Sequence, residues 1–101
     1  MQNSIKVTKA EIIEHIFEKT ELNKKQIHSV IDLFFEELKD ALVNDSIVEL
    51  RGLGTFEIRR RKGRERARNP KTGDIVPVDS HGVAVFRPGK ELKKLAWPLR
   101  D

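Results

Sequence analysis

The sequence predicts an α+β fold with two N-terminal helices, a three-stranded antiparallel sheet with a long β-ribbon arm, and a short C-terminal helix. Three observations support this class. Apolar residues recur at helical spacing up to residue 42 and at strand spacing after residue 47. A basic stretch follows the second strand and carries almost no aliphatic side chains, so it cannot be buried. The chain has 101 residues, the size of one domain, and we expect residues 1–101 to form a single unit.

The first helix is predicted over residues 9–19. Thr8 and Glu11 have the spacing of a capping box, because the hydroxyl can accept a hydrogen bond from the backbone N–H three residues on while the glutamate reaches back. Four apolar residues then recur at helical spacing: Ile12, Ile13, Ile16 and Phe17. Residues 1–7 are expected to form a short tail.

The second helix is predicted to begin after Asn23, which with Gln26 repeats the capping signal. A wide apolar stripe follows over about 20 residues, roughly 30 Å of helix, and should end near Asn44 and Asp45. The stripe consists of Ile27, Val30, Ile31, Phe34, Phe35, Leu38, Ala41 and Leu42.

A single chain has too few residues outside the arm to cover this apolar stripe. About a fifth of the residues lie in the exposed arm, and a body of this size is already short of buried area. We therefore expect an obligate dimer with Phe34, Phe35 and Leu38 near its interface.

The sheet is predicted to begin with a strand pair. Ile47, Val48 and Leu50 indicate one strand, residues 51–54 a turn, and Thr55, Phe56 and Ile58 a second strand whose hairpin continues as the arm, about residues 59–82. Asn69-Pro70-Lys71-Thr72-Gly73 is typical of a hairpin tip.

The chain returns from the tip through a strand with Ile75, Val76 and Val78, which Pro77 marks as an exposed or edge strand. His81-Gly82 is expected to break this strand before a last one over residues 83–87. Pro88-Gly89 then introduces a short basic helix from Lys90 to about Ala96, stopped by Pro98.

The positive charge is concentrated in one segment. Residues 51–75 hold nine cations, seven of them arginine, and three acids, which gives a net charge of +6. The other 76 residues carry eleven cations and thirteen acids, a net charge of −2. This distribution favours nucleic acid as the partner, ahead of an anionic membrane surface or an acidic protein.

Several function classes find no support. The chain has no cysteine, its three histidines have no metal-ligand spacing, and no serine lies in a nucleophile elbow. Gly52 and Gly54 precede a strand, so they do not form a phosphate loop. We expect no enzyme, metal, cofactor or small-molecule substrate. Neither a membrane-spanning run nor a signal peptide is visible, and we expect a cytoplasmic protein.

The tip of the arm suggests how DNA is bound. A two-stranded ribbon can enter a groove, and an apolar, conformationally fixed proline at its end can wedge between base pairs. On the residues alone, Pro70 is equally well read as an ordinary turn proline.

The chain resembles the HU/integration host factor family of bacterial histone-like DNA-bending proteins. The matching stretches cover about residues 8–96 in family order: Thr8-Lys9-Ala10-Glu11, Phe34-Phe35-Glu36-Glu37-Leu38, residues 48–56, Arg68-Asn69-Pro70-Lys71-Thr72-Gly73 and residues 86–93. The resemblance implies an intertwined dimer whose two arms embrace the minor groove of duplex DNA. Each Pro70 would intercalate, which bends and compacts DNA in the bacterial nucleoid and assists nucleoprotein assembly.

The resemblance also implies the DNA-binding residues. Around Pro70 they are Arg68, Asn69 and Lys71, with Arg66, Arg64, Arg61 and Arg59 lower on the arm. On the body they are Arg51, then Gly89, Lys90 and Lys93 at the last helix, and Thr8 and Lys9 at the first helix.

One departure from the family pattern and one match to a subfamily are informative. The stretch from Phe56 to Pro70 is one residue longer than the usual spacing, which leaves the register of the arm below Arg66 open. Glu49 and Arg51 match a glutamate-supported arginine of one integration host factor subunit. We therefore expect some preference for particular sites, largely through DNA deformability.

Two other functions stay open from the sequence. One is an RNA-binding or ribosome-associated basic protein, although RNA recognition relies on aromatic platforms that the basic segment lacks. The other is a dimerisation module with a solvated arm. A homodimer is expected, with a heterodimer as the alternative.

Overall fold

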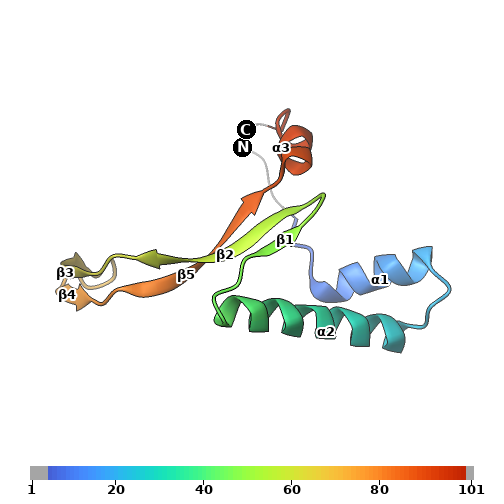
Figure 1. The fold of residues 1–101 in the computed structure, drawn as a ribbon, viewed down its shortest axis with the longest axis horizontal. Helices are drawn as coiled ribbons and strands as arrows, with labels where there is room; N and C mark the ends of the chain where they lie inside the picture. Colours follow the sequence, from blue (N-terminus) through green and yellow to red (C-terminus); the bar gives the residue numbers. More distant parts are fainter. Residues whose placement is uncertain (1–4, 100–101) are drawn as a thin grey trace.

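The computed structural model describes residues 5–99 and has the predicted α+β architecture (Figure 1). Two antiparallel helices lie below a twisted sheet, a long ribbon projects to one side, and a short helix follows the last strand. In chain order the elements are α1 (Lys9–Lys19), α2 (Lys24–Val43), β1 (Val48–Leu50), β2 (Gly54–Arg61), β3 (Arg64–Arg68), β4 (Ile75–Val78), β5 (His81–Pro88) and α3 (Lys90–Ala96).

Side-chain caps set the beginnings of the first two helices, as predicted. Asn23 Oδ1 accepts from the Gln26 N–H at 2.8 Å and Gln26 Oε1 accepts from the Asn23 N–H at 3.0 Å, so this capping box is complete. At α1 the Thr8 hydroxyl accepts from the Glu11 N–H at 3.3 Å. The Glu11 carboxylate lies 3.5 Å from that hydroxyl and does not reach the backbone, so half of the predicted box forms.

The main sheet has the order β1-β2-β5 and is antiparallel throughout. The arm grows out of β2 and β5, not out of the first two strands as the sequence suggested. These strands pair without interruption from Gly54 with Pro88 to Arg61 with His81.

The expected strand break at His81-Gly82 is wrong, because both residues belong to β5. Gly82 is opposite Arg60, and a Cβ at this position would lie 2.9 Å from Cγ2 of Ile58. Gly82 therefore allows β5 to pack closely against Ile58 of β2. The hydrogen-bonded pairing with β2 keeps Gly82 in the strand despite the low strand propensity of glycine. The interruption falls instead at residues 62–63 and 79–80, two on each leg.

The outer part of the arm is the two-stranded sheet of β3 and β4. Arg64 pairs with Val78 and Ala67 with Val76, so three steps along β3 match two along β4. This β-bulge places Glu65 and Arg66 opposite Pro77, which has no N–H to donate to the ladder. The bulge accommodates one extra residue where the family spacing left the register open.

The chain by itself buries very little. Within residues 5–99 the buried apolar side chains are Ile13 and Ile27, while Phe34 and Phe35 of α2 are 45% and 39% exposed. The radius of gyration is 18.6 Å, against about 13 Å for a compact chain of this length. The predicted dimer interface is thus an apolar face that another chain could cover. Among the described residues, no helix combines the length and apolar character that a bilayer span requires.

Candidate nucleic-acid interface

The sheet has two chemically different faces. Side chains alternate between faces along a strand, and Ile58, Gly82 and Ala84 line a hollow together with Leu42 and Val43 of α2. Phe56 and Phe86 pair directly across β2 and β5 on this helix-covered side, with ring centroids 4.8 Å apart. We call the opposite side the open face; its residues are Thr55, Glu57, Arg59 and Arg61 of β2 and His81, Val83, Val85 and Arg87 of β5.

Two of the predicted DNA-binding residues, Arg59 and Arg61, lie on the open face, whereas Arg60 alternates to the other side. A third arginine of this face, Arg87, was missed by the sequence analysis. Its Nε lies 2.6 Å from Oε2 of Glu57. The place of Arg87 on this face follows from the register of β5 against β2, for which the sequence carries no local signal.

The arginines continue from the sheet onto the outer arm. Arg61, Arg64, Ala67, Val78 and His81 line one hollow of about 460 Å³ at the interruption between the two parts of the ribbon, together with Lys62 and Val83. The structure therefore brings Arg61 and Arg64 to a common surface although the strands are interrupted between them. Arg66 and Arg68 are exposed further out on β3.

Hydrogen bonds fix the turn at the tip of the arm. The Asn69 N–H donates to the Asp74 carbonyl and the Gly73 N–H donates to the Asn69 carbonyl, both at 2.7 Å. Asn69 Oδ1 accepts from the Lys71 N–H at 2.9 Å, and Gly73 has φ +77°, the left-handed region that favours glycine. Pro70 is exposed on this turn. The Asn69 side chain thus holds the turn, while Pro70 and Lys71 are free to contact a partner.

A second group of predicted residues lies at the opposite end of the sheet. Arg51 and Gly89 line a hollow of about 270 Å³ with Glu49 and Thr55, among others. The Gly89 N–H donates to the Leu53 carbonyl at 2.9 Å, which joins the start of α3 to the turn after β1. Glu49 and Arg51 make no ion pair within the described part of the chain, so the glutamate-supported arginine that the resemblance suggested does not form here.

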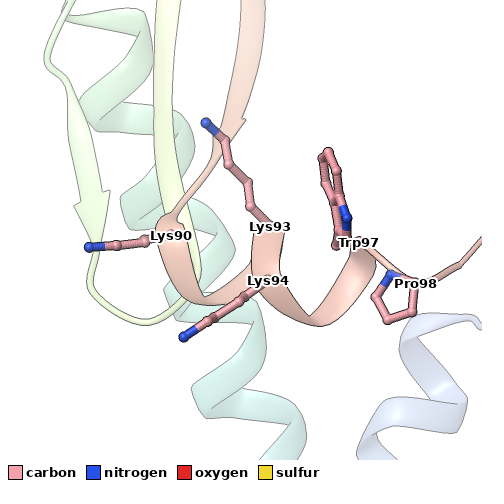
Figure 2. Close-up of a pocket in the computed structure, with 5 residues that line it drawn as sticks. All are labelled: Lys90, Lys93, Lys94, Trp97 and Pro98. Atoms are coloured by element: carbon pink, nitrogen blue, oxygen red, sulfur yellow. The ribbon is translucent and has the colours of Figure 1, made fainter.

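The lysines of α3 surround a pocket of about 480 Å³ (Figure 2). Lys90 and Lys93, both predicted to bind phosphate, are exposed, as is Lys94. Figure 2 shows Lys93 and the ring of Trp97 projecting to the same side of the helix, while Lys90 and Lys94 point away from the ring. Trp97 is 80% exposed and was not singled out by the sequence analysis.

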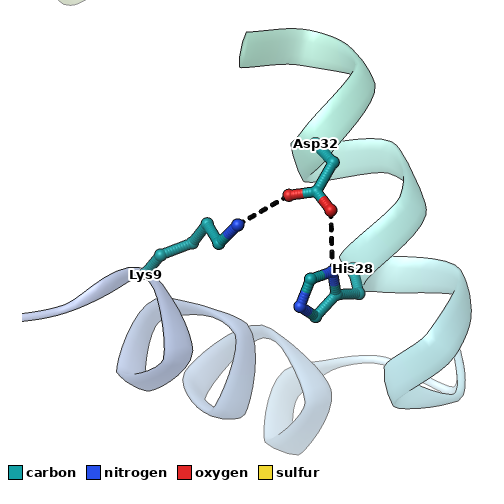
Figure 3. Close-up of polar contacts among 3 residues, drawn as sticks. All are labelled: Lys9, His28 and Asp32. Carbon is teal, nitrogen blue, oxygen red and sulfur yellow. Dashed lines mark hydrogen bonds and ion pairs between the residues drawn. The ribbon is translucent and has the colours of Figure 1, made fainter. Parts of the chain in front are cut away.

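The third group is the start of α1, where Lys9 is already engaged (Figure 3). Its Nζ lies 2.7 Å from Oδ1 of Asp32, and Nδ1 of His28 lies 2.9 Å from Oδ2 of the same carboxylate. The hydrogen bond from Lys9, supported by the charges of Lys9 and His28, holds the pKa of Asp32 below its ordinary value of 3.8. Thr8 caps the helix, so its hydroxyl is also partly committed.

Within one chain the predicted residues thus form three separate surfaces: the arm with the open face, the Arg51–Gly89 end with α3, and the start of α1. The first is by far the most basic. Its cations lie along an extended ribbon with an exposed proline at the end, a geometry that suits a long polyanion better than a small ligand.

Comparison with known proteins agrees with this reading. The family model described as bacterial DNA-binding protein matches residues 7–96. Integration host factor subunit alpha of Alteromonas mediterranea is 46% identical over 87 residues, which cover 86% of this chain and 87% of that protein. The same subunit of Yersinia pestis is also 46% identical, over 86% of this chain and 88% of that protein.

Solved structures show the same fold. A cocrystal structure of Anabaena HU with DNA superimposes with a TM-score of 0.79 and 34% identity, over 89% of this chain and 98% of that one. HU from Thermotoga maritima shares the fold with a TM-score of 0.63 and 24% identity, over 89% of this chain and 98% of that one. The chain belongs to the bacterial DNA-binding protein family that includes HU and integration host factor.

Proposed function

We propose that the protein is an architectural DNA-binding protein that works as a dimer, bends duplex DNA, compacts it and assists nucleoprotein assembly. Two arms enter the minor groove and each inserts Pro70 between base pairs. The observation that carries this proposal is the exposed proline at the end of a basic ribbon, on a turn that its own hydrogen bonds hold in shape.

The arm carries both the proline that unstacks a base step and the cations that bind the bent duplex. Unstacking a base step costs a few kcal/mol, which is offset when the bent duplex wraps onto more basic surface. Arg64, Arg66, Arg68 and Lys71 provide that surface beside the wedge, and Arg59 and Arg61 continue it onto the open face. Arg51, Gly89, Lys90 and Lys93, with Thr8 and Lys9, are proposed to hold the phosphates of DNA that folds back along the body.

A dimer accounts for the apolar surface of the isolated chain. Its accessible surface is 9491 Å², whereas a compact monomer of this mass exposes roughly 5,900 Å². We place the dimer interface on α2, at the exposed side chains of Phe34 and Phe35 and the half-buried Leu38. We propose a homodimer, in which residues 1–101 of each chain form one unit, and two arms double the charge of one.

We also propose that the protein acts in the cytoplasm, on the bacterial nucleoid, without catalytic activity or a cofactor. We further propose that the protein prefers particular DNA sites, which it recognises largely through the deformability of the duplex. The similarity to integration host factor subunit alpha supports that preference.

The test is a gel-shift titration of duplex DNA and duplex RNA across a salt series. We expect DNA to bind more tightly than RNA, with the logarithm of the affinity falling linearly with the logarithm of salt concentration, as phosphate neutralisation requires. Tighter binding of RNA would favour the ribosome-associated alternative. Absence of any salt-dependent binding would leave a dimerisation module with a solvated arm.

A further inference from the structure

We propose that Glu57 is a positioning residue for DNA binding: it holds Arg87 side-on, so that the free end of this arginine grips a backbone phosphate on the open face. The proposal rests on the proposed function and adds a phosphate contact and its support to it.

Glu57 is an acid placed among cations. Its side chain is 15% exposed, whereas those of Arg87 and Arg59 are 54% and 55% exposed. Oε2 of Glu57 lies 2.6 Å from Nε of Arg87 and 3.6 Å from Nη2 of Arg59. The carboxylate is therefore mostly covered, while both arginines extend past it to solvent.

The three residues share the open face by register. Glu57 pairs with Val85, Thr55 with Arg87 and Arg59 with Val83, so Arg87 and Arg59 flank Glu57 from neighbouring rows on the side away from α2. Oε2 of Glu57 is buried, and its contact with Arg87 is an ion pair by distance that lacks the alignment of a hydrogen bond. The ion pairs of Glu57 in the described residues are these two, and the one with Arg87 is the shorter.

The mode of contact decides what Arg87 can still bind. A guanidinium carries five N–H donors in a planar fork, and Nε is the atom of Arg87 that lies against Glu57, as an ion pair without hydrogen-bond alignment. The terminal amino groups remain available for a phosphate, which arginine binds with two parallel hydrogen bonds. Lysine would present all its donors from one nitrogen and lacks the planar edge that binds a phosphate with two parallel hydrogen bonds.

Holding Arg87 in place before DNA arrives lowers the entropy that binding would otherwise cost. Immobilising one long side chain costs enough to change affinity by about three- to tenfold. Glu57 thus strengthens DNA binding although it is negatively charged. As a bare anion it would repel the phosphate, but it is neutralised by two arginines, and the cluster has a net charge of +1.

The experiment compares four variants by fluorescence titration of a duplex at fixed pH across a salt series. Glu57→Gln should weaken binding about three- to tenfold although it removes a negative charge, and it should leave the salt slope unchanged. Arg87→Lys should weaken binding to a similar degree. Arg87→Ala should also reduce the salt slope by about 0.9 for each phosphate contact that is lost. Adding Glu57→Gln to Arg87→Lys should have no further effect.

Glu65→Gln is the matched control, since Glu65 is an exposed acid of β3 with no ion pair in the described chain. It removes the same charge and should bind DNA as tightly as the wild type or more tightly. If Glu57→Gln behaves like Glu65→Gln, the positioning role is wrong. Thermal unfolding of each variant separates this result from a loss of fold, and Arg87→Lys carries the test alone if Glu57→Gln unfolds. A wild-type protein that fails to bind the duplex would instead overturn the proposed function.

Discussion

Nζ of Lys9 in the first turn of α1 lies 2.7 Å from Oδ1 of Asp32 in the middle of α2. The pair joins the two consecutive helices through residues that are 23 positions apart. His28 contacts the other oxygen of the same carboxylate, so Asp32 has a cationic or hydrogen-bonding partner on each side. Asp32 draws one of the three ammonium N–H groups of Lys9, so a DNA phosphate at this site would share or compete for the lysine.

Asp32→Asn should cost stability near neutral pH and nothing in acid. The pKa of Asp32 is lower in the folded chain than its ordinary value of 3.8. The stabilisation is therefore fully present above about pH 4 and is lost as the pH falls through the folded pKa. Urea unfolding of both proteins between pH 7 and pH 2.5 measures the difference, which we expect to be small because the pair is exposed.

Asp40→Asn on the same helix is the control for this experiment, because its carboxylate makes no ion pair in the described residues. Its effect on stability should not follow that of Asp32→Asn. A constant difference between wild type and Asp32→Asn down to pH 2.5 would contradict the ion-pair explanation.

Gly54→Ala should destabilise the fold by about 1–3 kcal/mol or more. A Cβ at this position would collide with the backbone carbonyl of Arg87 and lie 2.7 Å from the ring of Phe86. The ring is held by its contact with Phe56, so neither neighbour can easily move. Chemical denaturation measures the loss. Gly73→Asn is the control: its Cβ would meet no atom within 4 Å, and asparagine tolerates the positive φ there.

The helices could be predicted closely because their signals are local. The caps at Thr8 and Asn23 fixed where α1 and α2 begin, and the end of the apolar stripe fixed where α2 stops. The tip could be predicted for the same reason, because its turn signals are local. The Asn69 side chain bonds the backbone two residues on, and Gly73 adopts a positive φ.

The sheet could not be predicted to the same degree, because its register depends on strands that are distant in sequence. His81 and Gly82 look like a break until β2 is seen to pair with them. The bulge opposite Pro77 depends on how β3 and β4 pair with each other, so the sequence of either strand alone does not indicate it. Arg87 was overlooked because its relation to Glu57 exists only across the ladder.

Replacing two neighbouring arginines should separate the two faces of the sheet. Arg59 lies on the open face and Arg60 on the opposite one, so Arg59→Ala should weaken DNA binding roughly three- to tenfold and Arg60→Ala clearly less. Both variants lose the same charge, and overall electrostatic attraction therefore cancels in the comparison. Equal losses in a titration at matched salt would mean that the arm acts as a diffuse cation and that the open face has no special role.

Pro70→Ala should reduce DNA bending while most of the affinity is kept. The turn that presents Pro70 is held by Asn69, Gly73 and Asp74, so an alanine at its exposed position leaves the fold of the tip intact. The cations of the arm still neutralise phosphates, but alanine lacks the rigid ring that separates two bases. Energy transfer between dyes at the two ends of a duplex measures the bend, and we expect a longer end-to-end distance at saturating protein.

Pro98→Ala is the control for that measurement, because it removes a proline outside the arm. It should leave the end-to-end distance as in the wild-type complex. The salt slope of Pro70→Ala should also match the wild type, since no cation has been removed. An unchanged distance for Pro70→Ala, with binding confirmed at the same salt, would show that the arms bend DNA by charge neutralisation alone. The proline would then be an ordinary turn residue.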